Sequence, residues 1–303
     1  MQNHFAGIEI GGTKLQIVVG DGGGAILKRY RYSVNRAKGA PGIREQIESA
    51  LAEVLSAQPV AAIGVGFGGP VDWRTGRICC SHHVEGWSEF ALGEWLHSIT
   101  GLTVRVDNDA NVAALGEALN GAGRGRDPVF YVTLGSGVGG GLVAGGQIYH
   151  GAAPGETELG HVRLDRQGTT VESRCAGWAV DRKIREQNRR EPGGVLGRLT
   201  AGMTSGEARC LSAALEQHDP AASGILRGTA EDLAFGLSHV VHLLHPEIIV
   251  LGGGLSLLGE PLRAAVAIAL PRFLMEAFQP GPDVALALLG EDAVPVGTMR
   301  LCR

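Results

Sequence analysis

The sequence predicts an α/β protein made of two related halves, and three observations support this fold class. An apolar strand, a glycine-rich turn and a second apolar strand occur over residues 5–19 and again over residues 129–144. Residues 103–117 have the pattern of a strand that turns directly into a helix. Further apolar strands and helix-favouring segments follow in each half. The repeated unit indicates two related domains, joined by a hinge rather than by a long linker.

Composition limits the classes of function. The chain has 303 residues, of which 44% are hydrophobic and 19% charged, as in globular proteins. Its formal net charge of −4 argues against nucleic acid as the main partner. No apolar run reaches the roughly 18 residues of a membrane span. The first residues lack a signal-peptide pattern, and five cysteines without a CxxC pair favour a reduced compartment, so we expect a cytoplasmic protein without membrane contact.

The elements follow from apolar periodicity and from turn residues. In the first half we expect strands over Phe5–Ile10, Leu15–Val19, Ala25–Val34 and Val60–Phe67. We expect a helix over Arg44–Leu55 and a second, short helix that is capped by Ser88 and runs through Leu96. In the second half we expect helices over Trp178–Arg189, Gly206–Gln217, Ala230–Leu244, Glu260–Phe278 and Val294–Leu301, with strands over Glu247–Leu251 and Val284–Leu289.

The stretch from Asp107 to Asp109 lies between the strand Thr103–Val106 and an Ala/Leu/Glu run. Short polar residues here bind the free amides of a helix start. An aspartate in the first turn is favoured as a carboxylate, which is the form a general base requires. From these residues alone, a turn with a cap and a site with Asp109 as base are equally good interpretations.

Two glycine-rich turns are candidate phosphate sites. Gly11-Gly12-Thr13-Lys14 lacks the GxxxxGK[ST] spacing, so it is either a plain β-turn or a hairpin whose amides bind phosphate with Thr13 or Lys14. The run from Gly135 to Gly140 matches GxGxxG, but a strand rather than a helix follows it, which excludes a dinucleotide site. One such hairpin in each half favours phosphate held from both sides.

Glu158 and His161 lie in the polar segment 154–161 and are three residues apart. A single turn therefore directs both side chains to one side. They are either ligands for sugar hydroxyls or part of a solvated loop.

The order of these motifs resembles the ROK family (repressors, open reading frames and kinases) of the actin/hexokinase superfamily. The matching stretches are Ile8–Lys14, Asn108–Asn111, Gly135–Gly141, Glu158–His161 and Leu251–Gly254, and they span essentially the whole chain. The Glu-x-Gly-His element with an upstream Asn-Asp is the most specific part. The resemblance implies a two-domain actin-like ATPase (ribonuclease H-like) fold with an interdomain cleft, a small domain of 1–116 plus the C-terminal helix 291–303, a large domain of 117–290, and a homodimer.

The resemblance also implies an ATP-dependent sugar kinase that transfers the γ-phosphate of ATP to a hexose hydroxyl. Glucose and its 6-OH are the first expectation, with an N-acetylhexosamine kinase or a fructokinase as alternatives. By resemblance, Asp109 is the general base. The implied sugar ligands are Gly69, Asn108, Glu158, His161 and Glu172, with Gly69 in the loop Gly68–Asp72. The implied ATP ligands are Gly11, Gly12, Thr13, Lys14, Gly135, Ser136 and Gly137, with Gly253 and Gly254 at the adenosine; Glu9 would contact Mg²⁺ through water.

The sequence departs from the family pattern at three places. Family kinases commonly carry a CxCGxxGCxE zinc motif, but the matching residues Arg166–Glu172 contain no cysteine and Cys175 lies beyond them. Zinc needs about four ligands, so we expect no structural zinc. Glu9 replaces the usual aspartate, and His82-His83 replaces a Pro-Asn pair that faces the sugar in relatives. The longer side chain of Glu9 would shift the water-mediated Mg²⁺ contact, and the two histidines, which are equally well explained as surface residues, leave the choice of sugar open.

Two other functions compete with the kinase. A ROK repressor carries an N-terminal helix-turn-helix domain, and a first strand that starts near Phe5 leaves no room for one. A sugar-binding protein without catalysis is the second alternative. Asp109 and both glycine hairpins are retained, which argues against it.

Overall fold

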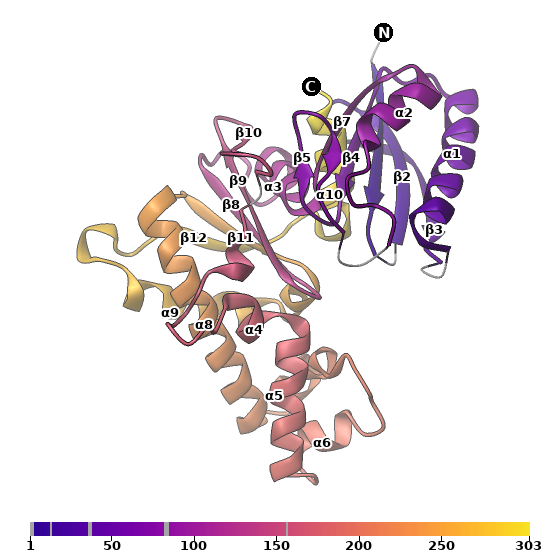
Figure 1. The fold of residues 1–303 in the computed structure, drawn as a ribbon. Helices are drawn as coiled ribbons and strands as arrows, with labels where there is room; N and C mark the ends of the chain where they lie inside the picture. Colours follow the sequence, from indigo (N-terminus) through magenta and orange to yellow (C-terminus); the bar gives the residue numbers. More distant parts are fainter. Residues whose placement is uncertain (1–2, 13, 36–37, 82–84, 156) are drawn as a thin grey trace. The chain divides into compact units, whose positions relative to one another are not determined.

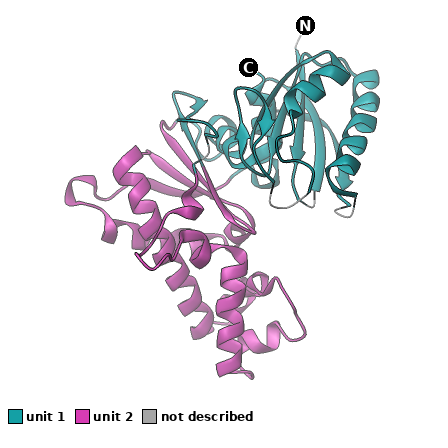
Figure 2. Ribbon diagram, viewed as in Figure 1, with its two compact units in different colours: residues 1–125, 141–157, 288–303 teal, residues 126–140, 158–287 magenta. Residues whose placement is uncertain are grey.

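The computed structural model describes residues 3–12, 14–35, 38–81, 85–155 and 157–303 (Figure 1). The chain divides into two compact units (Figure 2): the first comprises residues 1–125, 141–157 and 288–303, and the second comprises residues 126–140 and 158–287. The sequence-based expectation of a small domain that ends at residue 116 and a large domain that follows it stays a prediction.

A five-stranded sheet forms the centre of the first unit. Its order is β3 (Ile26–Ser33), β2 (Lys14–Asp21), β1 (His4–Ile10), β4 (Ala62–Phe67) and β7 (Thr103–Asn108). β1 pairs antiparallel with β2 and parallel with β4, and β4 pairs parallel with β7. β4 is buried along its whole length, in keeping with its continuous apolar sequence.

A second five-stranded sheet has the order β10 (Gln147–Ile148), β9 (Val138–Ala144), β8 (Val129–Leu134), β11 (Ile248–Gly252) and β12 (Asp283–Leu286). In both sheets a glycine-rich hairpin is followed by two strands that run parallel to the first strand of that hairpin. The predicted repeat is therefore confirmed in the topology. A strand follows Gly135–Gly137, as expected, and not the helix of a dinucleotide fold.

The helices of the first unit are α1 (Gly39–Ala57), α2 (Leu92–Thr100), α3 (Asp109–Asn120) and α10 (Ala293–Leu301). Those of the second unit are α4 (Val171–Cys175), α5 (Gly177–Arg190), α6 (Val195–Leu199), α7 (Leu211–Glu216), α8 (Pro220–Leu244) and α9 (Glu260–Ala269). A small antiparallel pair, β5 (Val71–Asp72) and β6 (Arg77–Ile78), also belongs to the first unit.

Opposite faces of the first sheet are covered by α1 and α10. Ile63 and Val65 of β4 share a buried cluster with Ile43 and Ile47 of α1. The alternate positions Ala62, Gly64 and Gly66 point to the other face, where a Cβ on Gly66 would lie 2.6 Å from Val294 Cγ1 of α10. Figure 1 shows the yellow helix α10 beside the strands of this sheet. The expected assignment of the C-terminal helix to the small domain stays a prediction.

Several expected boundaries are wrong. Ser88 does not cap α2, which begins at Leu92 after Ala91, because Glu89 takes a positive φ of 59° and interrupts the chain before the helix. The helix expected over 260–278 ends at Ala269, and Pro271 lies in the 3₁₀ turn that follows. The segment expected as one helix over 206–217 is a 3₁₀ turn, Glu207–Cys210, followed by α7.

The helix expected from Ala230 begins ten residues earlier, at Pro220. Asp219 accepts hydrogen bonds from the amides of Ala221 and Ala222, and Pro220 occupies the first turn. An N-cap aspartate followed by proline is a start signal that the sequence carries.

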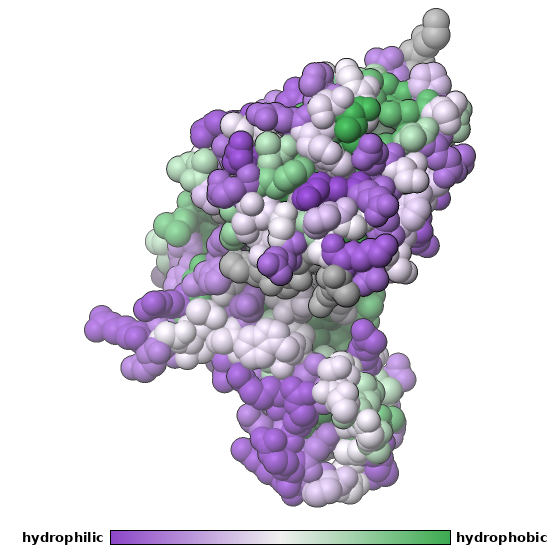
Figure 3. Space-filling model, turned by 45° about the vertical axis from the view of Figure 1, so that its right-hand side comes forward, coloured by the Kyte–Doolittle hydropathy of each residue, from purple (hydrophilic) through white to green (hydrophobic). Residues whose placement is uncertain are grey.

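The surface is mixed. On the face in Figure 3, hydrophobic residues occur in small groups between hydrophilic ones. Among the described residues, no helix combines the length and the apolar character needed to cross a membrane.

Candidate functional site

The carboxyl edge of the first sheet collects one group of the predicted residues. In the parallel register, Ile10 pairs with Phe67 and Phe67 pairs with Asn108, so β1, β4 and β7 end together. The first glycine turn, the loop after β4 and the start of α3 therefore lie at one edge. In open α/β sheets, ligands bind outside this edge.

Asn108 is the N-cap of α3. Its Oδ1 accepts from the amides of Ala110 and Asn111 at 2.9 and 3.3 Å, and its Nδ2 donates to the carbonyl oxygen of Gly69 at 3.1 Å. The cap role thus belongs to Asn108, and Asp109 is the first residue of the helix. The helix N-terminus favours the ionised form of an aspartate there.

The carboxylate of Asp109 lies against the loop after β4. A Cβ built on Gly68 would be 3.4 Å from Asp109 Oδ2 and 3.8 Å from the Cα of Gly11. Asp109, Gly68 and the beginning of the first hairpin are therefore neighbours. This places a carboxylate beside the turn that is predicted to bind phosphate.

The first hairpin is closed by a hydrogen bond from the Gly11 amide to the Lys14 carbonyl at 2.9 Å. Glu9 lies just before it, and its Oε2 accepts from the side-chain Nε2 of Gln16 and is 3.6 Å from Lys14 Nζ. A cation near Glu9 would compete with Lys14 for this carboxylate. Thr13 lies outside the described residues, as do His82 and His83.

The second glycine hairpin belongs to the second unit. The Gly135 amide donates to the Gly137 carbonyl at 2.9 Å, and the Val138 amide donates to Glu172 Oε2 at 2.9 Å. A Cβ on Gly137 would lie 2.6 Å from this same oxygen. Glu172, on α4, therefore holds the hairpin directly, and a side chain at position 137 would displace its carboxylate.

Glu158 precedes the 3₁₀ turn Leu159–His161 and His161 ends it, and Glu158 Oε2 is 3.9 Å from His161 Nε2. Their side chains are 48% and 76% exposed, respectively. A Cβ on Gly160 would be 3.4 Å from the Cβ of Glu172. A second group of predicted residues therefore lies in the second unit. It consists of Glu158, His161, Glu172 and the second hairpin.

A cavity of about 700 Å³ opens beside the second hairpin, within the range of small-molecule sites. Its lining is Gly135, Ser136, Gly177, Trp178, Asp181, Gly206, Ala208, Arg209, Ser212, Gly254, Leu255, Leu257 and Leu258. Gly135, Ser136 and Gly254 are predicted ATP ligands. Gly253 does not line the cavity, because it turns against the backbone of Leu134 with a φ of 79°.

Sequence reasoning missed the rest of this lining, above all Trp178 and Arg209. Trp178 is 42% exposed, and the guanidinium carbon of Arg182 is 5.3 Å from its ring centroid. The only sequence signal for Trp178 was its place at the start of an amphipathic helix, which does not distinguish a cavity wall from a surface residue.

The segment that replaces the family's zinc motif is held by hydrogen bonds. Arg163 and Thr170 form an isolated antiparallel bridge, and Asp165 Oδ1 accepts from the amides of Gln167 and Thr169 at 2.8 and 3.1 Å. A hydrogen bond from the Thr169 side chain, together with these amide bonds, lowers the pKa of Asp165. Thr170 and Ser173 then form a reciprocal capping box at the start of α4.

No metal cluster is evident in the described part of the chain, where no three His, Cys, Asp or Glu side chains gather in a way that could hold an ion. Burial raises the pKa of the Cys175 thiol to about 12, which disfavours the thiolate that zinc requires. The absence of structural zinc stays a prediction.

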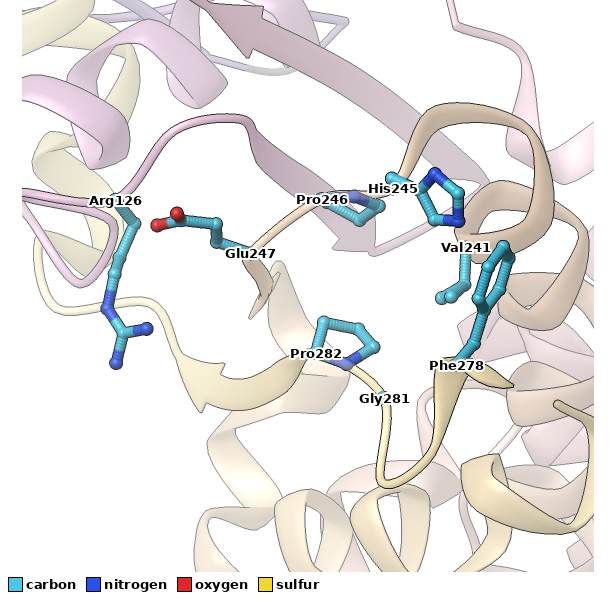
Figure 4. Close-up of a pocket in the computed structure, with 8 residues that line it drawn as sticks. All are labelled: Arg126, Val241, His245, Pro246, Glu247, Phe278, Gly281 and Pro282. Carbon is cyan, nitrogen blue, oxygen red and sulfur yellow. The ribbon is translucent and has the colours of Figure 1, made fainter. Parts of the chain in front are cut away.

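A smaller cavity of about 320 Å³ lies where β11 and β12 of the second sheet begin (Figure 4). Figure 4 shows Arg126 and Glu247 at one end and His245 and Phe278 at the other. Arg126 pairs with Asp283 at 2.6 Å, and Glu247 accepts from the Asp127 amide at 3.1 Å. None of the predicted site residues lines this cavity.

A profile of the ROK family matches residues 5–303. The chain belongs to the ROK family. It is 30% identical to a glucokinase of Halalkalibacterium halodurans, over 97% of this chain and 93% of that protein. It is 27% identical to a β-glucoside kinase of Klebsiella pneumoniae, over 82% of this chain and 81% of that protein.

Among solved structures, a ROK family glucokinase of Streptomyces griseus in complex with glucose and AMPPNP is 31% identical. It superimposes with a TM-score of 0.84 over 99% of both chains. A ROK hexokinase of Thermus thermophilus gives 28% identity and a TM-score of 0.82, over 98% of this chain and 97% of that one. The predicted actin-like ATPase fold is confirmed by these structural matches to ROK kinases.

Proposed function

We propose that this ROK protein is an ATP-dependent hexose kinase, with the 6-OH of glucose or a close relative as acceptor and Asp109 as general base. The observation that carries the proposal is the carboxylate of Asp109 at the first turn of α3, beside Gly68 and the first glycine hairpin. The similarity to glucokinases along nearly the whole chain supports the same reaction class.

In the proposed reaction, the sugar hydroxyl oxygen attacks the γ-phosphorus of ATP while its proton passes to the carboxylate of Asp109. The bond from the γ-phosphorus to the bridging oxygen breaks, and ADP leaves. Such transfers need in-line positioning and charge neutralisation more than covalent help from the protein. Gly69, Asn108, Glu158, His161 and Glu172 are proposed to bind the other sugar hydroxyls.

For the nucleotide, the proposal assigns phosphates to the two glycine hairpins and the adenosine to the cavity beside Gly135 and Gly254. The cavity's volume suits a nucleoside, and Trp178 offers an aromatic face for a base. Mg²⁺ usually arrives with the nucleotide and keeps several waters, so it does not need a cage of protein ligands. Glu9 is the carboxylate proposed to bind one of those waters, where the cation would neutralise phosphate charge.

The test is ATP-dependent phosphorylation across a panel of hexoses and N-acetylhexosamines, with product sugar phosphate measured directly. Loss of a general base lowers rates by about 10²- to 10⁴-fold, so Asp109→Asn should lose this much in kcat while its sugar dissociation constant stays within a few fold. A protein that binds sugar and ATP but phosphorylates nothing on the panel is instead a non-catalytic binding relative. Turnover confined to N-acetylhexosamines or fructose would replace glucose as the acceptor.

Two further expectations stay predictions. A homodimer is expected by family resemblance, and light scattering after gel filtration measures it. The cytoplasmic location likewise remains an expectation from the sequence.

A further inference from the structure

Asp107 is a buried carboxylate directly before the candidate catalytic residues, and three donors hold it. It is 2% exposed. Its Oδ1 accepts from the Asn108 amide at 2.8 Å and from Asn111 Nδ2 at 3.0 Å, and its Oδ2 accepts from His150 Nε2 at 2.6 Å. Because burying a carboxylate is costly unless it is paired, these bonds fix both Asp107 and its partners.

His150, which follows β10, connects this carboxylate to an aromatic side chain on another loop. Its ring stacks on Trp73, with centroids 4.2 Å apart and planes 14° from parallel. Trp73 follows β5, and β5 follows the loop that contains Gly69. The imidazole is thus hydrogen-bonded at its edge and packed on its face, which leaves it one orientation.

The network joins three separate segments of the first unit. Asn108 donates to the Gly69 carbonyl, and Asn111 Nδ2 donates to the Gly155 carbonyl at 3.4 Å. Gly155 has a φ of 90°, and a Cβ there would lie 3.1 Å from His150 Cβ and 3.2 Å from Trp73 Cδ1. Glycine at position 155 therefore lets the backbone there approach the stacked pair closely.

We propose that Asp107, His150 and Trp73 are positioning residues for the sugar-binding part of the site. The idea rests on the proposed function. The three side chains do not contact the substrate; they hold Asn108, Asp109 and Gly69 in the arrangement that binds the acceptor. All three belong to the first unit, whereas the candidate nucleoside cavity is lined by residues of the second. Their loss should therefore weaken sugar use and spare nucleotide binding.

Substitutions at residue 150 separate the hydrogen bond from the stacking. His150→Ala removes both, His150→Phe keeps an aromatic face without a donor, and His150→Gln keeps a donor without the ring. Misplacement of reacting groups by about 1 Å can cost about 100-fold, so kcat/KM for the sugar should fall about 10- to 100-fold in His150→Ala. The dissociation constant of AMPPNP without sugar should stay within about threefold.

Relative to His150→Ala, His150→Gln should recover at least about a third of the fall in log(kcat/KM) for the sugar. His150→Phe should recover less. Trp73→Ala should resemble His150→Ala, while Trp73→Phe should be mild. His97→Ala is the matched control, because His97 is an exposed histidine of the same unit on α2, away from the network.

Equal losses in sugar use and AMPPNP binding in His150→Ala would contradict the proposal. So would a lower melting temperature with an unchanged sugar KM, since both indicate a merely structural role. A wild-type protein that binds hexose without phosphorylating it overturns the kinase function alone; the same variants are then compared by sugar dissociation constants in calorimetry. A wild type that neither binds nor phosphorylates any hexose overturns both.

Discussion

Glu117, near the end of α3, is a fully buried carboxylate, and replacing it with glutamine tests how the C-terminal helix is attached. Its Oε2 accepts from the amides of Ala122 and Leu288 at 2.8 and 3.1 Å, and its Oε1 accepts from the Leu289 amide at 2.7 Å. Leu288 and Leu289 lead into the turn before α10. One side chain therefore connects the two helices that pack side by side in the first unit.

The size of the effect follows from these three bonds. Glutamine can keep its oxygen at the Oε2 position, but its amide nitrogen then faces the Leu289 N–H. One charge-assisted bond is lost, about 1.5–3 kcal/mol, and a buried donor is left unpaired, about 1–3 kcal/mol. Removing a buried charge offsets part of this loss. We expect Glu117→Gln to lower the free energy of unfolding of the first unit by about 2–4 kcal/mol.

The assay is urea unfolding followed by tryptophan fluorescence. Trp73, Trp87 and Trp95 belong to the first unit and only Trp178 to the second, so the signal reports mainly on the first. Glu48→Gln is the matched control, because Glu48 is an exposed glutamate on α1. A change in Glu117→Gln no larger than in Glu48→Gln, about 0.5 kcal/mol at most, would refute the reasoning.

Three further predictions follow from the packing, the thiols and the cavity. Gly297→Ala should destabilise the first unit by about 2 kcal/mol or more, because a Cβ on Gly297 would overlap the backbone of Val112 in α3; a urea midpoint equal to that of wild type would show that the helices adjust. Burial raises the pKa of Cys175 and of Cys302 to about 12 in the folded protein from an ordinary value of 9.0, so their contribution to stability is complete below pH 9 and is lost as the pH rises from 9 to 12. Unfolding titrations at pH 8 and pH 10.5 should show this fall, and a Cys175→Ala/Cys302→Ala variant should show a smaller one. Trp178→Ala should raise the KM for ATP about fivefold or more, from lost base stacking, with the sugar KM unchanged; the reverse pattern would remove the nucleoside from that cavity.

Local signals predicted much of the fold. The apolar runs of β1, β4 and β8 and the polar cap of α3 are consequences of neighbouring residues, and the structure agrees with them. The errors at Pro220 and Pro271 overlooked signals that the sequence carries, whereas the error at Ser88 came where the backbone departs from a local rule. Glu89 in a positive φ separates Ser88 from α2, and no residue type near it announces this conformation.

In the candidate site, too, some residues could be predicted from local signals and others could not. Asn108, Asp109 and the spacing of Glu158 and His161 could be identified from short motifs. The contact of Glu172 with the Val138 amide could not, because it joins residues 34 positions apart. The same holds for His150 and Asp107, 43 positions apart, and for Trp178, whose neighbours in the cavity include residues of three distant segments.

The first unit is discontinuous in sequence, and this sets an order in its assembly during synthesis. The strands β1, β4 and β7 leave the ribosome long before residues 288–303, which supply the helix that covers one face of their sheet. The second unit lies between them and is complete first. Until α10 arrives, the nascent sheet exposes an apolar face that chaperones recognise. The same geometry makes residues 288–303 a detachable segment: given as a separate peptide to a chain that ends at residue 287, it should bind the uncovered face and complete the first unit.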